Sequence, residues 1–190
     1  FGPNVVAAFV VALRVRALMN TPGWGFGLAS SSLVGQSLGA GREPEADEYA
    51  RDTLRFTVAA YVVVAVAVFV VAAPVSHLFV TEPAVQSTTT ALIRAACVSV
   101  LLWGVMNGAM GPLRASGDTT WPFYGQIAGL VGFALPLAYL GATTGLGIWG
   151  LYGTLFVETA VPAAVIYYRY QTEQWKLISR ANRQAAVGSA

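Results

Sequence analysis

Three long stretches of the sequence contain no Asp, Glu, Lys or Arg, and this feature restricts the fold more than any other. They lie between Arg55 and Glu82, between Arg94 and Arg114, and from Thr119 to Val157. About 20 apolar residues form a helix long enough to cross the hydrocarbon core of a bilayer. Because each stretch reaches that length, membrane-spanning helices are predicted and β-strand spans are not.

The predicted fold is an all-α, polytopic membrane bundle of five transmembrane helices. The third stretch is long enough for nearly two crossings, and the small residues from Gly141 to Gly147 predict a turn that divides it. Thr21-Pro22-Gly23 predicts a break or kink in the first span, which is too long for one straight crossing. The predicted spans are 5–39, 56–79, 91–113, 120–140 and 147–169, with a charged loop over 43–55, a bundle over 1–170 and a tail over 171–190.

Composition supports a chain that faces lipid and argues against several other classes of protein. Hydrophobic residues make up 56% of the chain and charged residues only 11%, too few for a water-facing surface. The net charge of +2 and the lack of a basic, aromatic groove pattern predict no nucleic-acid partner. Cys97 is the only cysteine, which we expect to pack in a span, and His77 is the only histidine, which we expect at the surface. We therefore expect no metal cluster, no organic cofactor and no enzyme activity.

Basic residues are concentrated in alternate connections, which predicts an orientation in the membrane. Arg42, Arg51 and Arg55 follow the first span, Arg114 follows the third, and four further basic residues follow the fifth. By the positive-inside rule, these connections and the C-terminal tail lie in the cytoplasm, with the spans in the cell membrane. The chain starts at Phe1 without a signal sequence, so we expect a fragment preceded by an odd number of spans.

The end of the first predicted span is rich in small residues. The segment Leu33-Val-Gly-Gln-Ser-Leu-Gly-Ala-Gly41 contains Gly35, Gly39 and Gly41. Small residues allow two helices to approach closely, and a glycine directly after a helix allows the chain to turn. We therefore expect close helix packing followed by a turn.

This segment, with Ala46, resembles the glycine-rich end of the second helix of a lobe in multidrug and toxic compound extrusion (MATE) transporters. Leu113-Arg-Ala-Ser-Gly-Asp-Thr119 resembles the turn between the tenth and eleventh helices of that family. The further members of this ordered resemblance are Pro122, Leu135-Pro-Leu-Ala-Tyr-Leu140 with Pro136, Gly147-Ile-Trp-Gly150 and Trp175. The motif residues of the turn are Arg114, Gly117, Asp118 and Thr119.

The resemblance implies helices eight to twelve of a twelve-helix, two-lobed carrier, so the N-terminal lobe would lie outside this chain. It also implies alternating access and export of cationic or amphiphilic compounds in exchange for Na⁺ or H⁺. Some sodium-coupled members have an aspartate three turns before the arginine that corresponds to Arg114. Trp103 stands at that position here, which weakens the case for the same sodium site.

Glu158 is the only carboxylate in the middle of a predicted span, where an ionised group needs a partner or a wet cavity. Pro162 has no N–H to donate to the carbonyl of Glu158, so a backbone acceptor is freed near the carboxylate. Glu158 is therefore the leading candidate for ion coupling or cation recognition. The alternative is a hydrogen-bonded glutamate between packed helices.

Other polar and aromatic residues in the spans are candidates for a substrate cavity. Asn107 precedes the helix-kinking Pro112, and Trp103 offers an indole face to an aromatic cation, although both residues are also typical of packing. Gln36, Tyr124 and Gln126 lie near predicted cytoplasmic ends of spans, where they either line a cavity or satisfy backbone groups.

The remaining charged residues of the spans have structural interpretations. Arg114 and Asp118 are four residues apart at a helix end, which predicts an ion pair or a turn cap that braces the connection. Arg14, Arg16 and Arg94 are predicted to extend toward the external interface.

A secondary multidrug transporter is the preferred function, and three alternatives stay open. A relative that flips lipid-linked oligosaccharides would need a cationic groove for a large anionic headgroup. An intramembrane enzyme would need a Ser/His pair, paired aspartates or a metal cluster inside the spans. The third alternative is a structural half-carrier that is inactive alone, because a carrier normally needs both lobes around its pathway.

Overall fold

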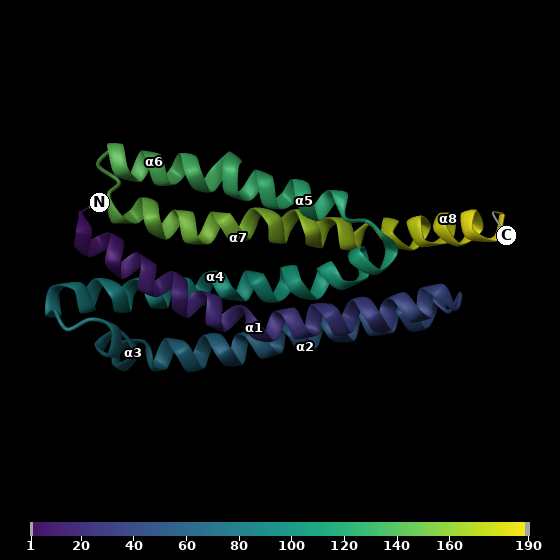
Figure 1. Cartoon of the computed structure of the whole chain (residues 1–190), viewed down its shortest axis with the longest axis horizontal. Helices are drawn as coiled ribbons and strands as arrows, with labels where there is room; N and C mark the ends of the chain where they lie inside the picture. Colours follow the sequence, from purple (N-terminus) through teal and green to yellow (C-terminus); the bar gives the residue numbers. More distant parts are fainter. Residues whose placement is uncertain (1, 189–190) are drawn as a thin grey trace.

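The computed structural model describes residues 2–188, which are almost entirely helical (Figure 1). Five segments of this described part are long and apolar enough to cross a membrane: Pro3–Gly39, Glu43–Val70, Val85–Ser116, Thr120–Thr143 and Ile148–Gln171. The all-α fold with five spans is therefore confirmed. The helices are α1 (Pro3–Gly39), α2 (Glu43–Val70), α3 (Ala72–Phe79), α4 (Pro83–Ser116), α5 (Thr120–Ile127), the π-helix η1 (Ala128–Ala134), α6 (Leu135–Thr143), α7 (Ile148–Gln171) and α8 (Gln174–Gly188).

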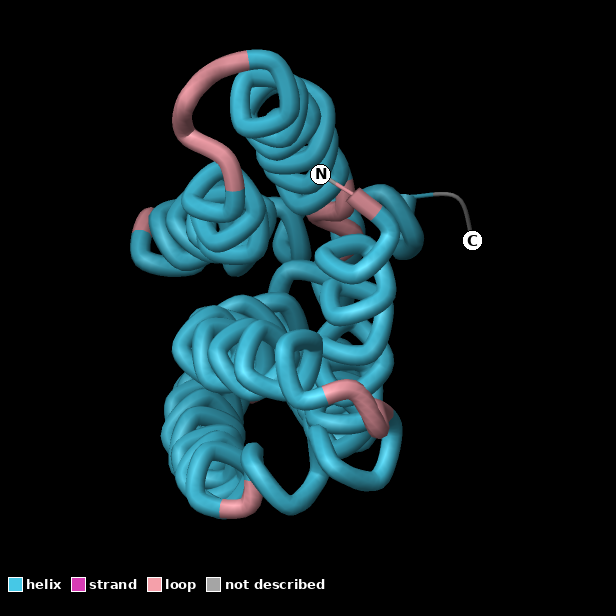
Figure 2. The backbone as a smooth tube through the Cα atoms, turned by 90° about the vertical axis from the view of Figure 1, so that its left-hand side faces the viewer, coloured by secondary structure: helices cyan, strands magenta, loops and turns pink. Residues whose placement is uncertain are grey.

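The spans form two groups that meet where α4 packs against α7. The first group contains α1, α2 and α4, each in contact with the other two, and the second contains α7 packed against α5, η1 and α6. Figure 2 looks along the bundle and shows the helices end-on, with short loops joining them. The α1–α2 turn, the α4–α5 turn and α8 lie at one end of the bundle in Figure 1, hereafter the α8 end.

The structure corrects the start of the second span, because residues 43–55 form the first turns of α2 and not a loop. Pro44 occupies the first turn, where its missing N–H is tolerated, and Glu43 and Glu45 interact favourably with the helix dipole. Asp47 and Arg51 add an i,i+4 ion pair of 3.0 Å. Local helix signals therefore extend α2 beyond its apolar part.

Two prolines bend or modify spans without ending them. α1 is continuous across Pro22, so the predicted break does not occur, but Figure 1 shows the predicted change of direction near the middle of the helix. In the fourth span, the N–H of Leu135 bonds to the carbonyl of Leu130, five residues back, directly before Pro136. Since Pro136 has no N–H, the helix keeps its hydrogen bonds by widening into η1.

The tail forms α8, which is attached to both turns at the α8 end. Trp175 is 1% exposed, so its indole acts as an apolar anchor. Arg180 donates two hydrogen bonds to the carboxylate of Glu43, at 2.7 and 2.5 Å. The amide of Asn182 donates to the carbonyl of Ser116 at 3.1 Å. α8 thus contacts the start of α2 and the end of α4.

Lys176 lies 3.0 Å from both Asp47 and Glu173. Burial by itself would lower the pKa of this ammonium group, but the hydrogen bonds to the two carboxylates raise it above its ordinary value. Lys176 therefore stays charged at physiological pH and helps to hold α8 against α2.

Glycines of α4 allow close contacts in the first group. A Cβ at Gly108 would lie 2.8 Å from the side chain of Leu54 in α2, and one at Gly111 would lie 2.4 Å from the Cβ of Ser30 in α1. In the α1 motif, a Cβ at Gly35 would meet only ordinary contacts, and one at Gly39 would meet no described atom within 4 Å. Glycines of α4 thus bring the helices closer than those of the predicted motif.

We predict that Gly111→Ala lowers the free energy of unfolding by about 1–3 kcal/mol, because the new methyl group must displace Ser30 or separate α1 from α4. The matched control is Gly25→Ala, since Gly25 is an exposed residue of α1 whose added Cβ would meet nothing within 4 Å. The melting temperature of each variant in detergent measures the effect. Equal melting temperatures for the two variants would show that the α1–α4 contact is not as tight as described.

Candidate functional site

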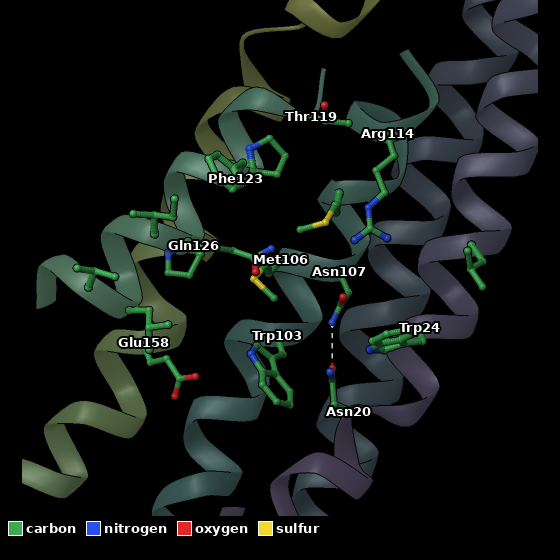
Figure 3. Close-up of a pocket in the computed structure, with 18 residues that line it drawn as sticks. Asn20, Trp24, Trp103, Met106, Asn107, Arg114, Thr119, Phe123, Gln126 and Glu158 are labelled. Carbon is green, nitrogen blue, oxygen red and sulfur yellow. Dashed lines mark hydrogen bonds between the residues drawn. The ribbon is translucent and has the colours of Figure 1, made fainter. Parts of the chain in front are cut away.

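A cavity of about 830 Å³ lies between the two helix groups. Its volume is in the range of sites that hold drug-sized molecules. Figure 3 shows the lining side chains, which come from α1 and α4 on one side and from α5, η1 and α7 on the other. They are Asn20, Gly23, Trp24, Leu28, Trp103, Met106, Asn107, Met110, Arg114, Thr119, Pro122, Phe123, Gln126, Ile127, Leu130, Val131, Glu158 and Pro162.

The wall of the cavity is mainly apolar and aromatic, with few polar groups. Glu158 is its one carboxylate and Arg114 its one basic residue among the described lining side chains. Four predicted cavity residues, Glu158, Asn107, Trp103 and Gln126, are brought together here. Such a surface suits a flat amphiphilic molecule, because aromatic and methionine side chains adapt to different apolar shapes.

Glu158 forms an ion pair with Arg16, and this pair joins the two helix groups. The guanidinium Nη2 of Arg16 lies 2.7 Å from the carboxylate Oε2, and the two side chains are 5% and 34% exposed. Arg16 also donates to the carbonyl of Leu155 at 3.4 Å and lies 4.7 Å from the ring centre of Trp103. The predicted extension of Arg16 to the interface is wrong, because a carboxylate, a carbonyl and an indole face are closer partners.

The two other arginines predicted to extend toward the interface, Arg14 and Arg94, differ from Arg16 in their exposure. Arg14 and Arg94 are exposed, and Arg94 lies 5.2 Å from the ring centre of Phe69. The indole of Trp103, predicted as a surface for a substrate cation, already receives the guanidinium of Arg16. Trp103 therefore positions the ion pair as well as lining the cavity.

The carbonyl of Glu158, freed by Pro162, is covered by the neighbouring helix. A Cβ at Gly129 of η1 would lie 3.2 Å from this carbonyl oxygen and 2.7 Å from Pro162 Cδ. Gly129 therefore lets η1 approach α7 at this point.

Asn107 belongs to a hydrogen-bonded group that ties α1, α2 and α4 together. Its amide nitrogen donates to Asn20 Oδ1 at 3.2 Å and to the Tyr61 hydroxyl at 3.0 Å, and Tyr61 donates to Asn20 Oδ1 at 2.5 Å. Gly23 allows the Tyr61 hydroxyl to approach α1. Sequence reasoning did not select Asn20 or Tyr61, although an asparagine two residues before Pro22 was a usable signal.

The predicted pairing of Arg114 with Asp118 is wrong. Asp118 Oδ2 accepts a hydrogen bond from Arg169 Nε of α7 at 2.6 Å, and Arg169 lies 5.3 Å from the ring centre of Trp121. The physical reason is Gly117, whose φ of +85° turns the chain after α4. Asp118 thereby reaches α7, while Figure 3 shows the guanidinium of Arg114 directed toward the cavity.

Tyr124 and Gln36, which were predicted for the cavity, are not among its described lining residues. Tyr124 is 62% exposed, and the exposed amide of Gln36 donates to Ser32 Oγ at 3.1 Å. Of the motif residues, Arg114, Thr119, Pro122 and Pro162 line it, whereas Gly41 and Gly117, with φ of +76° and +85°, form turns.

These features together define a polytopic helical membrane protein with a drug-sized cavity between two helix groups. The MatE family model matches residues 1–140. The chain therefore belongs to the MATE family of transporters, as its motifs indicated.

Two individual proteins show how much of such a transporter this chain represents. The Bacillus subtilis (strain 168) protein named "Probable multidrug resistance protein YoeA" is 27% identical over 172 residues, which are 90% of this chain and 37% of that protein. The crystal structure of the eukaryotic MATE transporter AtDTX14 is similar in fold, with a TM-score of 0.86 at 23% identity. The similarity covers 96% of this chain and 41% of AtDTX14. The chain thus spans well under half the length of both relatives.

We predict that Glu158→Gln destabilises the bundle by about 2 kcal/mol, because it leaves the buried cation of Arg16 without its counter-ion. The loss should be smaller than the roughly 3–5 kcal/mol of a fully buried pair, since the carboxylate is partly exposed. Adding Arg16→Gln to this variant should restore part of the stability. Melting temperatures of the single and double variants in detergent measure the coupling.

A double variant whose loss equals the sum of the two single losses would contradict this interpretation. The Asp118–Arg169 pair supplies the control, because Asp118→Asn affects a different contact of α7 and should not be rescued by Arg16→Gln.

Proposed function

We propose that the full-length protein is a secondary active antiporter of the cell membrane that exports cationic or amphiphilic compounds in exchange for Na⁺ or H⁺. The observation that carries this proposal is the 830 Å³ cavity, with an apolar and aromatic wall and one carboxylate. The printed name of the Bacillus relative, which refers to multidrug resistance, supports the same class of substrate. Because the chain covers under half of its relatives, transport requires the rest of the protein.

Glu158 is the proposed coupling residue, and its ion pair gives it a physical means of acting. Binding of H⁺ or Na⁺ at the carboxylate weakens its attraction to Arg16. Arg16 then keeps the Leu155 carbonyl and the Trp103 ring as partners, so the cation is not left alone in the bundle. Since the pair joins α1 to α7, its strength affects how firmly the two helix groups are held together.

The proposed orientation places the α8 end in the cytoplasm. Arg42, Lys176 and Arg180 lie near this end, together with other basic residues of α2 and α8. Cytoplasmic connections carry more Lys and Arg than external ones, which supports this orientation. The cavity would then take up its substrate from the cytoplasmic side in one state of the cycle and release it outside in the other.

An oligosaccharide-lipid flippase is a weaker candidate for the same fold. A large headgroup with several phosphates or acidic sugars needs several cations along its groove. The described lining contains one arginine, so an amphiphile of drug size suits the cavity better.

We predict that vesicles containing the full-length protein export ethidium when an inward H⁺ or Na⁺ gradient is imposed. Glu158→Gln should reduce this gradient-dependent export to background, because the variant has no carboxylate to bind the ion. Fluorescence of the dye, measured with each gradient imposed separately, gives the rate and identifies the ion.

Glu82→Gln is the control, because Glu82 is an exposed carboxylate before α4 and outside the cavity. Export that survives in Glu158→Gln would place coupling in the other part of the protein. Wild-type vesicles that export no dye under either gradient would contradict the antiporter proposal.

A further inference from the structure

A second, smaller cavity of about 260 Å³ lies at the α8 end of the bundle, where it is lined by residues of α2, of the end of α7 and of the start of α8. It shares no lining residue with the cavity of 830 Å³. Its volume is below the roughly 300 Å³ at which sites for drug-sized molecules begin, so it suits a smaller group. The lining residues are Asp47, Arg51, Leu54, Arg55, Tyr167, Tyr170, Gln171, Glu173 and Trp175.

This second cavity lies where the apolar part of the bundle ends. Arg55 is the last charged residue of α2 before the charge-free stretch that continues to Glu82. Tyr167 and Tyr170 belong to the last turns of α7, which ends at Gln171. Tyrosine is enriched where a membrane meets water, and arginines near the ends of spans extend to the same level. The second cavity is therefore at the level of the lipid headgroups.

The inner wall of this cavity is aromatic and its rim is charged. The rings of Tyr170 and Trp175 are stacked, with centres 6.4 Å apart and planes 4° from parallel, and both residues are buried. The side chains of Arg51 and Arg55 are 59% and 78% exposed. A polar group at the membrane surface can therefore reach the arginines without disturbing the packed aromatic residues.

The charged residues of the rim are ordered along the bundle. Asp47, Arg51 and Arg55 follow one another at intervals of four residues, and all three line the cavity. At about 1.5 Å per residue, Asp47 lies about 12 Å farther along α2 from the apolar part of the helix than Arg55 does. Glu173 comes after the end of α7, on the same outer side. The cavity thus has an inner level with two arginines and an outer level with two carboxylates.

Nearby partners leave a charge of opposite sign at each level. The inner level has one further carboxylate, that of Asp52, which lies 3.7 Å from Arg55. The two outer carboxylates share the ammonium group of Lys176, which lies 3.0 Å from each of them. An ion pair of 3.0 Å between Arg51 and Asp47 joins the two levels. The formal charge is therefore +1 at the inner level and −1 at the outer level.

We propose that this cavity binds the headgroup of a phosphatidylethanolamine lipid, with the phosphate at Arg51 and Arg55 and the primary ammonium at Asp47 and Glu173. In such a lipid the phosphate is next to the glycerol and the ammonium lies farther out, which matches the order of the two levels. The planar donors of a guanidinium suit phosphate oxygens, and an ammonium has three N–H donors for carboxylates. A choline headgroup lacks these donors, and a glycerol headgroup lacks the positive charge.

The test measures the dissociation constants of three lipids with identical acyl chains for the delipidated full-length protein, by native mass spectrometry. Phosphatidylethanolamine should bind about fivefold more tightly than phosphatidylcholine or phosphatidylglycerol. Arg55→Gln should weaken the binding of all three lipids about fivefold, because each has a phosphate. Glu173→Gln should weaken phosphatidylethanolamine by a similar factor and change phosphatidylglycerol less than about twofold, because only the first has an ammonium.

Both substituted side chains are largely exposed, at 78% for Arg55 and 64% for Glu173, so the fold should be kept. Arg14→Gln is the matched control, since Arg14 is an exposed arginine of α1 that lines neither cavity, and it should leave all three affinities unchanged.

Four results would overturn the proposal. Equal affinities for the three lipids would show a non-specific lipid layer, and tighter binding of phosphatidylglycerol would show that net negative charge is what the protein selects. Unchanged binding of phosphatidylethanolamine to both variants would place its headgroup elsewhere. Soluble phosphoethanolamine that binds as tightly as the lipid would identify a free metabolite and not a lipid as the ligand.

Discussion

The low dielectric of the bilayer makes the ion pair between Arg16 and Glu158 important for the packing of the two helix groups. In water such a pair contributes little, because both charges are well solvated apart. Within a membrane span, neither charge is tolerated without the other or an equivalent partner. The pair therefore adds a charged link between α1 and α7 to the packing of α4 against α7, where the two helix groups meet. The cavity lies between these groups, so its shape depends on this contact.

Close backbone contacts between helices hold the bundle together in addition to the ion pair. Between helices in lipid, apolar burial provides little driving force, so packing depends on small residues that let backbones approach. Gly111 allows α1 to meet α4, and Gly129 allows η1 to meet α7 beside Pro162. The first contact fixes one wall of the cavity and the second fixes the other. Packing and charge pairing thus act on the same two helix groups.

The sequence was sufficient for the number of spans and for a few polar and aromatic residues of the cavity, because charge-free stretches and isolated polar residues are local signals. Glu158, Asn107 and Gln126 could be selected for this reason. Partners distant in sequence could not be derived. Arg16 and Glu158 are 142 residues apart, and the choice of Arg169 over Arg114 as the partner of Asp118 depends on how α4 and α7 are oriented. The helical start of α2 was missed because its polarity outweighed its capping signals.

The attachment of α8 has a mechanical consequence for how the first helix group can move. Glu43 connects α8 to the start of α2, and Ser116 connects it to the end of α4. Bending between these two helix ends would break charge-assisted hydrogen bonds and expose the indole of Trp175. A motion that keeps these contacts moves α8 together with α2 and α4. The tilt of α8 would in this way follow the position of the first helix group.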